Sequence, residues 1–495
     1  MTQNSHSIQK VFLEIDTSSM VMANSIKNSL AMFLQNEIFP LLEKYFNSIK
    51  NIENQIIQIE KLEILIDSDT EKKDILFSNS ETKNDIKKQI EREIQKFIND
   101  AEKNSKNGQK NELEWKSISS KDKQIKTLLY FIENGSMPWW ISKEEEIIFF
   151  KELNFNSLQN ENFSALFRKL IHQEKVQKRI INQFSNQEIA LLSTTFLKSE
   201  TQQKPISTNR LLPLLNQKTH RFKVLFWQSV FDFWIEKKPI HLIKFYHQEQ
   251  ALFLSKEISF NLFFENIKLL VPLDFTNEEI IQMKTDYLTS EKEKTIAKSD
   301  SDSKKDKPEP KSILINEEVI IEDNHQDDDN GSKSCYVQNA GLIILHPFFK
   351  EMLKSCDLMD DNNTLLNKEL AAHILHYAAT KKENDYEHSM LFEKFLCGIP
   401  LHESIQRKIK IEDKHKKQVE EMLDSVVLHW SALKNTSTAV LRSEFLQREG
   451  KLDLSESNPK LFIERKTQDL LLEKIPWNIS IVKIPWIQKL IYTQW

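Results

Sequence analysis

The chain has 495 residues, a formal net charge of −5 and 39 % hydrophobic residues, enough for two to four domains with a sizeable core. Only six residues are glycine, about 1 % against a usual 7 %. Neither of the glycine-rich loops that cradle nucleotide phosphates, GxxxxGK[ST] and GxGxxG, occurs in the sequence. The composition therefore argues against nucleotide-dependent enzymes of these two classes.

The cysteines and the first residues bear on the compartment. Cys335, Cys356 and Cys397 have no CxxC spacing and leave one cysteine unpaired in any disulfide scheme, which is typical of a reducing cytoplasm. The opening MTQNSHSIQKVFLEID lacks the basic region and apolar core of a secretion signal, and no apolar run reaches about 18 residues. We expect a soluble protein made in the cytoplasm, without a membrane span.

Negative charge is concentrated in one segment. Residues 299–334 hold eleven acidic and five basic residues, so the other 459 residues carry a balance of about +1. A nearly neutral folded part lacks the Lys/Arg surface that nucleic-acid phosphates require. Seven acids and no Lys or Arg lie between Glu317 and Asp329, without the DxDxDG spacing of a calcium loop. We predict a disordered, solvated linker at 299–334 and no nucleic-acid partner.

Residues 1–103 predict a small β-α-β unit followed by an amphipathic helix. Alternating apolar residues predict strands at 8–16 and 57–67, and a change of phase near Lys61 indicates two short strands or a bulge. The helical pattern between them meets Pro40, which kinks the helix or opens another. A charged helix with an apolar stripe follows, and we favour a core face over a partner-binding face for its residues Ile86, Ile90, Ile94, Phe97 and Ile98.

A polar linker at 104–124 precedes a helical, aromatic-rich middle at 125–298. The sequence LLYFIENGSMPWWIS predicts a helix that ends at Gly135. Base-stacking platforms line a basic groove with aromatic rings, whereas we favour a helical core or helix–helix contact for the rings in this segment. Six of them fall within thirteen residues: Phe222, Phe226, Trp227, Phe231, Phe233 and Trp234.

The last segment, 335–495, predicts an α+β domain with helices first and a small sheet last. Short apolar runs separated by turn residues predict strands in LFIER, LLLEK and ISIVKI, after Leu452. The fold class predicted for the whole chain is mainly α with α+β parts. Helical patterns in this domain cover 368–380, 387–397, 411–433 and 437–449.

Two histidines raise the question of a metal site. His373 and His376 lie at i and i+3 of one helix, where both could reach one ion, as a metal-dependent hydrolase would need. The residues between them are apolar, so the glutamate of an HExxH motif is missing. Cys397 closes a helix instead of opening one, which leaves it without a helix N-terminus to lower its pKa. Three other side chains that could bind a metal have no diagnostic spacing to the pair: His346, His429 and Cys397. We therefore favour buried core histidines and predict no catalytic, cofactor or metal site.

His346 stands at the end of the apolar run in YVQNAGLIILHPFF. Because Pro347 follows, we expect extended backbone at His346. Its ring can donate and accept hydrogen bonds that fix a chain reversal into a helix at 348–353. This interpretation makes the histidine part of the scaffold.

The end of the chain repeats a Pro-Trp pair around one apolar run. Pro476 with Trp477 and Pro485 with Trp486 bracket a predicted strand at 478–483. Proline suits a strand end, where no donor is needed for the ladder. Each indole combines a large apolar surface with one N–H donor, so we expect it to fasten a corner of the domain.

Four segments, YVQNAGLIILHPFF, KFLCGIP, HWSALKNTSTAVLRSEFLQREGKL and IPWNISIVKIPW, in this order resemble the C-terminal region of contractile injection system tape measure proteins. These belong to phage-tail-like particles in which a sheath contracts around an inner tube. The N-terminal block and GSMPWW resemble the same family more weakly. The resemblance implies structural roles for Tyr336, Asn339, Gly341, His346, Pro347, Cys397, Gly398, Pro400, Trp430, Arg442, Phe445, Arg448, Gly450, Pro476, Trp477, Pro485 and Trp486.

The resemblance implies a non-enzymatic assembly role in the cytoplasm of a producing bacterium, in contact with inner-tube and baseplate proteins and with no small-molecule substrate. Such a protein helps to set the length of tube and sheath; an assembly chaperone or terminal cap of the same particle is the alternative. A wholly helical chain of 495 residues would extend about 740 Å at about 1.5 Å per residue. The short predicted helices leave both an extended ruler and a folded factor open.

Overall fold

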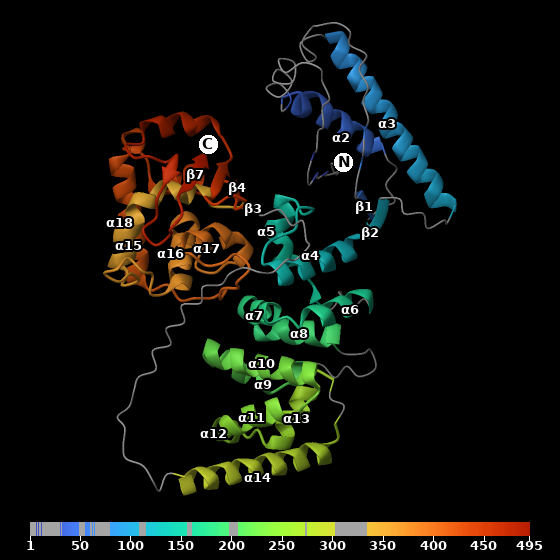
Figure 1. Cartoon of the computed structure of the whole chain (residues 1–495), viewed down its shortest axis with the longest axis vertical. Helices are drawn as coiled ribbons and strands as arrows, with labels where there is room; N and C mark the ends of the chain where they lie inside the picture. Colours follow the sequence, from blue (N-terminus) through green and yellow to red (C-terminus); the bar gives the residue numbers. More distant parts are fainter. Residues whose placement is uncertain are drawn as a thin grey trace. The chain divides into compact units, whose positions relative to one another are not determined.

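The protein is mainly α-helical, with a small mixed sheet near its C-terminus (Figure 1). The computed structural model describes residues 6, 8, 11, 30, 32–48, 55–59, 62, 64, 80–107, 115–155, 161–197, 206–272, 275–301 and 334–495. Two compact units divide the chain: Met1–Tyr130 with Met137–Leu158, and Phe131–Ser136 with Gln159–Trp495. The predicted fold class is confirmed.

The first unit joins helices to a two-stranded antiparallel sheet. Strand β1 pairs with β2 so that Gln55 faces Ser119 and Ile59 faces Trp115. Residues 32–48 form one continuous helical run in which Pro40, the second residue of α2, directly follows the π-helical turn η1, so the proline does not open a separate helix. The described elements are η1 (Leu34–Ile38), α2 (Phe39–Ser48), β1 (Gln55–Ile59), α3 (Ser80–Asn107), β2 (Trp115–Ser119), α4 (Ser120–Asn134, which enters the second unit) and α5 (Lys143–Glu152).

The apolar stripe of α3 forms the core of this unit, as predicted. Ile90 and Ile94 are buried and belong to one cluster with Phe33 and Ile38. The predicted linker at 104–124 instead contains the end of α3, all of β2 and the start of α4, because its polar residues include the alternating WKSIS run.

Two predicted strands are only partly within the described residues. The strand expected at 8–16 lies almost entirely outside them. Of the strand expected at 57–67, β1 covers the beginning, whereas Leu62 and Ile64 are described without strand structure, and Lys61 lies outside the described residues.

The central helices of the second unit form a core rich in aromatic rings. Thr219 caps the start of α10 by accepting a hydrogen bond from the Phe222 N–H, and Lys237 ends the helix in left-handed conformation. Trp227 is fully buried, and its indole donates to Asn186 Oδ1 at 2.8 Å, so the predicted helical core is confirmed. The elements are α6 (Glu161–Leu170), α7 (Glu174–Gln183), α8 (Asn186–Leu197), η3 (Ile206–Thr208), α9 (Leu211–Asn216), α10 (His220–Glu236), α11 (Ile240–Gln248), α12 (Gln250–Ser255), α13 (Phe260–Lys268) and α14 (Asn277–Ser301).

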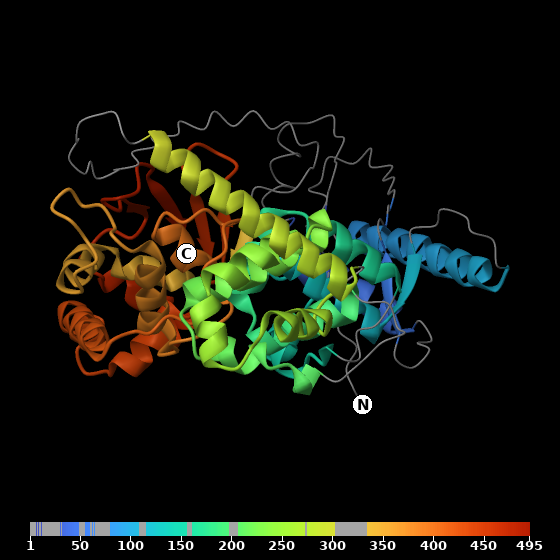
Figure 2. The ribbon, with the colours of Figure 1, turned by 90° about the horizontal axis from the view of Figure 1, so that it is seen from below.

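The long helix α14, yellow in Figure 2, is the last of the central helices in the chain and packs alongside α11. Gly135 ends α4 as predicted, with φ of +75° and its N–H bonded to Phe131 O at 2.7 Å. The predicted acidic linker begins within α14 and ends at Ser334; its residues 302–333 lie outside the described residues.

The C-terminal part of the second unit combines helices with a five-stranded sheet of order β3-β4-β5-β7-β6. All neighbouring strands are antiparallel except β5 and β7, which are parallel. The elements are β3 (Ser334–Val337), η4 (Ala340–Leu345), α15 (His346–Ser355), α16 (Lys368–Thr380), η5 (Glu387–Met390), α17 (Leu391–Leu396), α18 (Asp413–His429), η6 (Ser431–Leu433), α19 (Thr438–Leu441), η7 (Arg442–Leu446), β4 (Gly450–Asp453), β5 (Lys460–Ile463), η8 (Thr467–Lys474), β6 (Ile481–Val482) and β7 (Ile491–Gln494).

Several predictions for this part need correction. The LLLEK run belongs to the 3₁₀ helix η8, because Asp469 accepts a hydrogen bond from the Lys466 N–H and turns the chain. The strand predicted at 478–483 shortens to β6, whereas the strand predicted in LFIER is present as β5, which covers the first three residues of that run and Lys460 before it. The helix predicted at 437–449 ends at Leu446 as α19 and the π-helical turn η7. Strands β3, β4 and β7 were not predicted.

The backbone prediction for His346 is also wrong. His346 has φ of −52° and ψ of −34°, so it is the first helical residue of α15, with Pro347 next to it. Proline is favoured in the first turn of a helix, and the His346 ring bonds through Nδ1 to Ile343 O at 3.0 Å, which holds the reversal. Burial lowers the pKa of His346, although the bond to Ile343 O acts in the other direction.

Candidate functional site

Helix α16 brings both histidines of the AAHILHYAA run into the core. Asn367 caps its start by accepting the Leu370 N–H at 3.0 Å, and Lys381 ends it in left-handed conformation. Most of the helix, including residues 371–376, is buried, and His373 and His376 are each only 1 % exposed. At such burial, each ring needs a protein partner to compensate its lost hydration.

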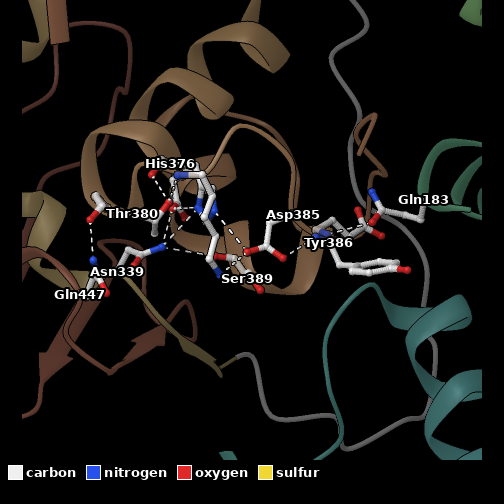
Figure 3. A network of polar contacts seen from close by, with 12 residues as sticks. Gln183, Asn339, His376, Thr380, Asp385, Tyr386, Ser389 and Gln447 are labelled. Carbon is white, nitrogen blue, oxygen red and sulfur yellow. Dashed lines mark hydrogen bonds and ion pairs between the residues drawn. The ribbon is translucent and has the colours of Figure 1, made fainter. Parts of the chain in front are cut away.

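His376 lies between two carboxylates. Its Nδ1 donates to Glu393 Oε1 at 2.8 Å, and its Nε2 is 3.6 Å from Asp385 Oδ2. Asn339, one of the motif residues, donates its Nδ2 to the same Glu393 oxygen at 2.7 Å. Figure 3 shows His376 flanked by Asn339 and Asp385, with Thr380 one turn further along α16.

The two carboxylates hold His376 as a cation. Burial acts to lower the pKa of His376, but the contact with Asp385 and the hydrogen bond to Glu393 outweigh it and raise the pKa to about 9. Burial acts to raise the pKa of Asp385, yet His376 and Lys382 keep it well below its ordinary value. The arrangement is therefore a buried ion cluster at neutral pH.

His373 has a different environment, although it is only three residues away. Its Nε2 donates to Gln406 O at 2.7 Å. Burial lowers the pKa of His373, so the ring stays neutral. The two rings thus have separate protein partners, and within the part of the chain that the structure describes no group of three His, Cys, Asp or Glu side chains could hold one metal ion.

A second buried ion cluster lies beside the first, around Glu387. Arg179 Nε donates to Glu387 Oε1, and Lys394 Nζ donates to Glu387 Oε2 at 3.3 Å. All three side chains are 0 % exposed. Burial lowers the pKa of Lys394, an effect that Glu387 opposes. Buried charges of this kind persist only where each one has a partner.

Carbonyl groups complete the coordination of the two cations. Arg179 also donates to Ile132 O at 2.9 Å and Glu133 O at 2.8 Å, the free carbonyls in the last turn of α4, and to His402 O at 2.5 Å. Lys394 donates to Leu401 O at 2.9 Å and to Glu403 O at 2.5 Å. The cluster therefore joins α4, α7, η5 and the loop after α17.

Gly135 makes room for this cluster. A Cβ at this position would lie 2.8 Å from Glu387 Oε1 and 2.9 Å from Arg179 Nε, and the backbone has positive φ. Both the space and the conformation therefore favour glycine. The glycine that ends α4 also lets α4 approach the ion pair.

The end of α7 is bonded to the loop after α17 by uncharged groups as well. Asn182 donates its Nδ2 to Ser404 Oγ at 2.9 Å, and Asn182 O accepts the Arg407 N–H at 3.1 Å. Gln183 donates its Nε2 to Ile405 O at 2.7 Å, and its Oε1 accepts the Glu387 N–H at 2.9 Å. Gln183 and the residue before Glu387, Tyr386, lie close together in Figure 3.

Two motif glycines allow close backbone approach. A Cβ on Gly341 would lie 1.7 Å from Phe445 O, so η4 contacts η7 with no space for a side chain. A Cβ on Gly450 would lie 2.7 Å from the Cβ of Ala340 and 2.8 Å from Phe462 O. Gly341 is thus required by the contact of η4 with η7, and Gly450 by the close approach of β4 to η4 and β5.

The three motif tryptophans each donate the indole N–H to a backbone carbonyl. Trp430 is fully buried and packs edge-on against Phe445 at 4.8 Å between ring centroids. Pro476 and Pro485 are exposed, while the tryptophans that follow them face the core. The acceptors are Leu471 O at 3.1 Å for Trp430, Ile344 O at 2.9 Å for Trp477 and Leu396 O at 2.8 Å for Trp486.

The two motif arginines hold neighbouring elements. Arg442 donates to Ala378 O at 2.9 Å and makes a bidentate pair with Glu420 at 2.7 and 3.2 Å. Arg448 is fully buried and donates to Asp469 Oδ1 at 2.5 Å, which orients η8.

The remaining motif residues lie at the surface or at helix ends. Tyr336 is 74 % exposed on β3, and Pro347 and Pro400 are also exposed. Gly398 has φ of +65° after α17. Cys397 is buried, and burial raises its pKa far above the ordinary value, so it remains an unreactive thiol.

Sequence reasoning missed Arg179, Glu387, Glu393 and Lys394. A signal was present for three of them. Arg179 stands between Val176 and Ile180 on the apolar face of α7, and Glu393 and Lys394 stand inside the apolar run MLFEKFL. A charge on a face that should be buried predicts a buried partner, but the partner of Arg179 is 208 residues away in the sequence.

The described helices include none long and apolar enough to cross a membrane. Comparison with curated proteins and with solved structures found no match. Residues 5–495 match the family described as contractile injection system tape measure protein. This match covers nearly the whole chain, including both units and the two ion clusters. The chain therefore belongs to the contractile injection system tape measure protein family, and membership implies association with other components of such a system.

Proposed function

We propose that the chain is a non-enzymatic assembly protein of a contractile injection system, which contacts inner-tube and baseplate proteins and helps to set the length of tube and sheath. Family membership over residues 5–495 supports this role. The ionisable side chains of the two clusters are taken up by bonds within the protein, as expected for a scaffold. We also propose that it is made and acts in the cytoplasm of the producing bacterium.

We further propose that the chain acts in its folded form. The observation that carries this proposal is the Arg179–Glu387–Lys394 cluster, whose members come from α7, η5 and α17 and are fully buried. Pulling these segments apart would expose or unpair the charges, which is strongly unfavourable. A folded chain suits an assembly factor or a terminal cap that controls when tube growth stops.

Element lengths support the same proposal. The longest described helices, α3 with 28 residues and α14 with 25, extend about 42 and 37 Å at about 1.5 Å per residue. Neither approaches the roughly 740 Å of a fully helical chain. An extended ruler would have to unfold the second unit, including its core.

The domain boundaries inferred from sequence remain a proposal. We assign 1–103 to the N-terminal unit with its amphipathic helix, 125–298 to the helical middle, 299–334 to the acidic linker and 335–495 to the family's C-terminal domain. The contacts of α7 with Glu387 and with residues 404–407 support joint folding of the middle and the C-terminal domain.

Loss of the gene in the producing bacterium tests the proposed function. We expect particles to be absent or to have uncontrolled length, and expression of the wild-type chain to restore them. Chemical cross-linking during assembly, followed by mass spectrometry, should recover peptides of tube or baseplate subunits joined to this chain. Normal particles of normal length in the deletion strain would contradict the proposal.

A further inference from the structure

A small cavity of about 70 Å³ lies where the central helices contact the C-terminal domain. It is lined by the last residues of α7 and the turn before α8, by His220 and Lys223 of α10, and by residues 406–408. A water molecule takes up about 30 Å³ of the liquid, so the cavity has room for a group of a few heavy atoms. Every segment that lines it belongs to the second unit.

Three cations line or border this cavity. Lys223 donates its Nζ to Phe184 O at 2.6 Å, and Arg407 donates to Gln183 O at 3.0 Å. Lys408 is exposed at the cavity's edge. One carboxylate lies near them, Glu188 Oε2, at 3.7 Å from Arg407. The cavity therefore carries an excess of positive charge.

The pKa values of Lys223 and His220 are both lowered, as expected for buried groups beside an excess of positive charge. Burial, together with the nearby charges of Arg407 and Lys408, lowers the pKa of Lys223 to about 8, although Glu188 acts in the other direction. Burial and the charge of Lys223 lower the pKa of His220 to about 4, so His220 is neutral. Its Nε2 bonds to Asn182 Oδ1 at 2.9 Å. A negative group in the cavity would relieve the repulsion between the cations.

The backbone contributes potential of both signs, because the carbonyls of Gln183 and Phe184 at the end of α7 also face the cations. Helix α8 begins at Asn186, directly after the lining residue Ser185, so the positive end of its dipole lies beside the cavity. The Arg407 guanidinium is held over the Tyr386 ring at 4.1 Å, which fixes its position at the cavity wall.

We propose that this cavity binds an oxyanion, a phosphate or carboxylate group, between Lys223, Arg407 and Lys408. Charge-assisted hydrogen bonds from ammonium and guanidinium groups suit both groups. Because the cations come from α10 and from the loop after α17, a bound anion links the central helices to the C-terminal domain. The site adds a ligand to the assembly role and does not depend on it.

Isothermal titration calorimetry of the full chain with inorganic phosphate tests the site. We expect saturable binding that Lys223→Gln weakens at least about tenfold, because the charge-assisted bond is lost. Lys244→Gln is the matched control, since Lys244 is an exposed residue of the neighbouring helix α11 that does not line the cavity. Its affinity should equal that of the wild type. Equal affinity of Lys223→Gln and the wild type would overturn the proposal.

Lys408→Gln keeps the test decisive if Lys223→Gln does not fold. Lys408 is exposed, so its replacement should leave the fold intact. We expect weaker phosphate binding, with a thermal unfolding midpoint that rises less on phosphate addition than that of the wild type. An unchanged phosphate affinity in Lys408→Gln would contradict a site between the three cations.

The anion in the cavity is either a free ion or a carboxylate of the chain's own acidic segment. A variant with the seven acids of 317–329 replaced by their amides distinguishes these two sources. Tighter phosphate binding than in the wild type would show that the chain's own carboxylates compete for the cavity. The same affinity in both would assign the site to a free anion. Absence of phosphate binding in both proteins would overturn the site.

Discussion

At the scale of single residues, His376 shows how the protein uses buried charge. Glu393 and Asp385 hold its ring as a cation, and Asn339 bonds to the same Glu393 oxygen. A histidine pair on one helix face suggested metal binding from sequence, but His373 donates to a backbone carbonyl instead. The role of a buried histidine thus depends on which partners the fold brings to it.

The protonation of His376 predicts a fall in stability at alkaline pH. Its pKa is about 9 in the folded protein, above the ordinary value of 6.5, so its stabilising contribution is fully present below pH 6.5 and is lost as pH rises through 9. The loss is on the order of 3 kcal/mol. Urea unfolding at pH 6.5 and pH 9.5 measures it.

Glu393→Gln provides the comparison, because the other titrating groups are present in both proteins. We expect a smaller loss of stability between the two pH values in this variant, since the raised pKa of His376 depends on Glu393. If wild type and variant lost the same free energy of unfolding, the buried cation would be ruled out.

Elemental analysis checks the histidine pair directly. Because both rings are engaged by protein groups, we expect no stoichiometric zinc or iron in purified protein. Purification in metal-containing buffer without chelators makes the result informative. One equivalent of metal that is lost in His373→Gln would revive the hydrolase alternative.

Two glycine replacements separate lack of space from backbone strain. Gly341→Ala places a methyl group against Phe445 O, so we expect a loss of about 3 kcal/mol or more, or failure to fold. Gly398→Ala places a methyl group 4.0 Å from the end of the flexible Lys368 side chain, at positive φ, and should lose only about 1 kcal/mol. Denaturant unfolding ranks the two variants, and a reversed order would contradict the close contact of η4 with η7.

At the scale of elements, the structure shows how far local pattern determines the fold. Helix α16 begins and ends where its 3.6-residue pattern and caps predict, at Lys368 and Thr380. The apolar LLLEK run was misread because Arg448 and Asp469, not local propensity, turn it into η8. Strand β3 was missed because its ladder depends on β4, more than 100 residues later.

The pairing within the Arg179–Glu387–Lys394 cluster could not be predicted from the sequence, because Arg179 and Glu387 lie far apart in the chain. The charges on α7 and α17 were visible, but only the tertiary fold pairs Arg179 with Glu387. The role of the motif tryptophans was easier to predict, because a buried indole N–H needs one hydrogen-bond acceptor. Their acceptors still had to come from the structure, where Trp477 donates to Ile344 O, 133 residues earlier in the chain.

A double-mutant cycle tests whether the Arg179–Glu387 pair joins α7 to η5. We expect Arg179→Met and Glu387→Gln each to destabilise the protein by about 3 kcal/mol, because each leaves a buried partner uncompensated. The double variant should lose less than the sum, with a coupling energy of about 2 kcal/mol. Additive losses would show that the pair does not couple these elements.

The exposed pair Lys178–Glu174 on the same helix is the matched control. Its atoms are 2.7 Å apart, but both side chains are largely exposed. Solvent screens such a pair, so its removal by Lys178→Met should leave the unfolding curve nearly unchanged. A loss as large as that of Arg179→Met would mean that helix propensity, and not the buried pair, explains the effect.

At the scale of the whole molecule, the second unit extends its bonded contacts from α4 to the last strand. Residues of α7 bond to residues more than 200 positions later, and the sheet closes with a parallel pair between β5 and β7. Such long-range pairing makes the unit cooperative. A chain that unravelled to measure length would lose all of these contacts together.

We propose that this member of the tape measure family acts as a folded protein. An insertion of about 40 helix-forming residues between residues 301 and 334, which leaves every described helix and strand intact, tests it most directly. An insertion of about 40 Gly and Ser residues at the same place is the control for composition. Particle lengths are then measured by electron microscopy in strains that carry each variant. If the chain acts in its folded form, both variants give particles of unchanged length at normal yield, whereas a lengthening of about 60 Å, the rise of about 40 helical residues, would contradict the proposal.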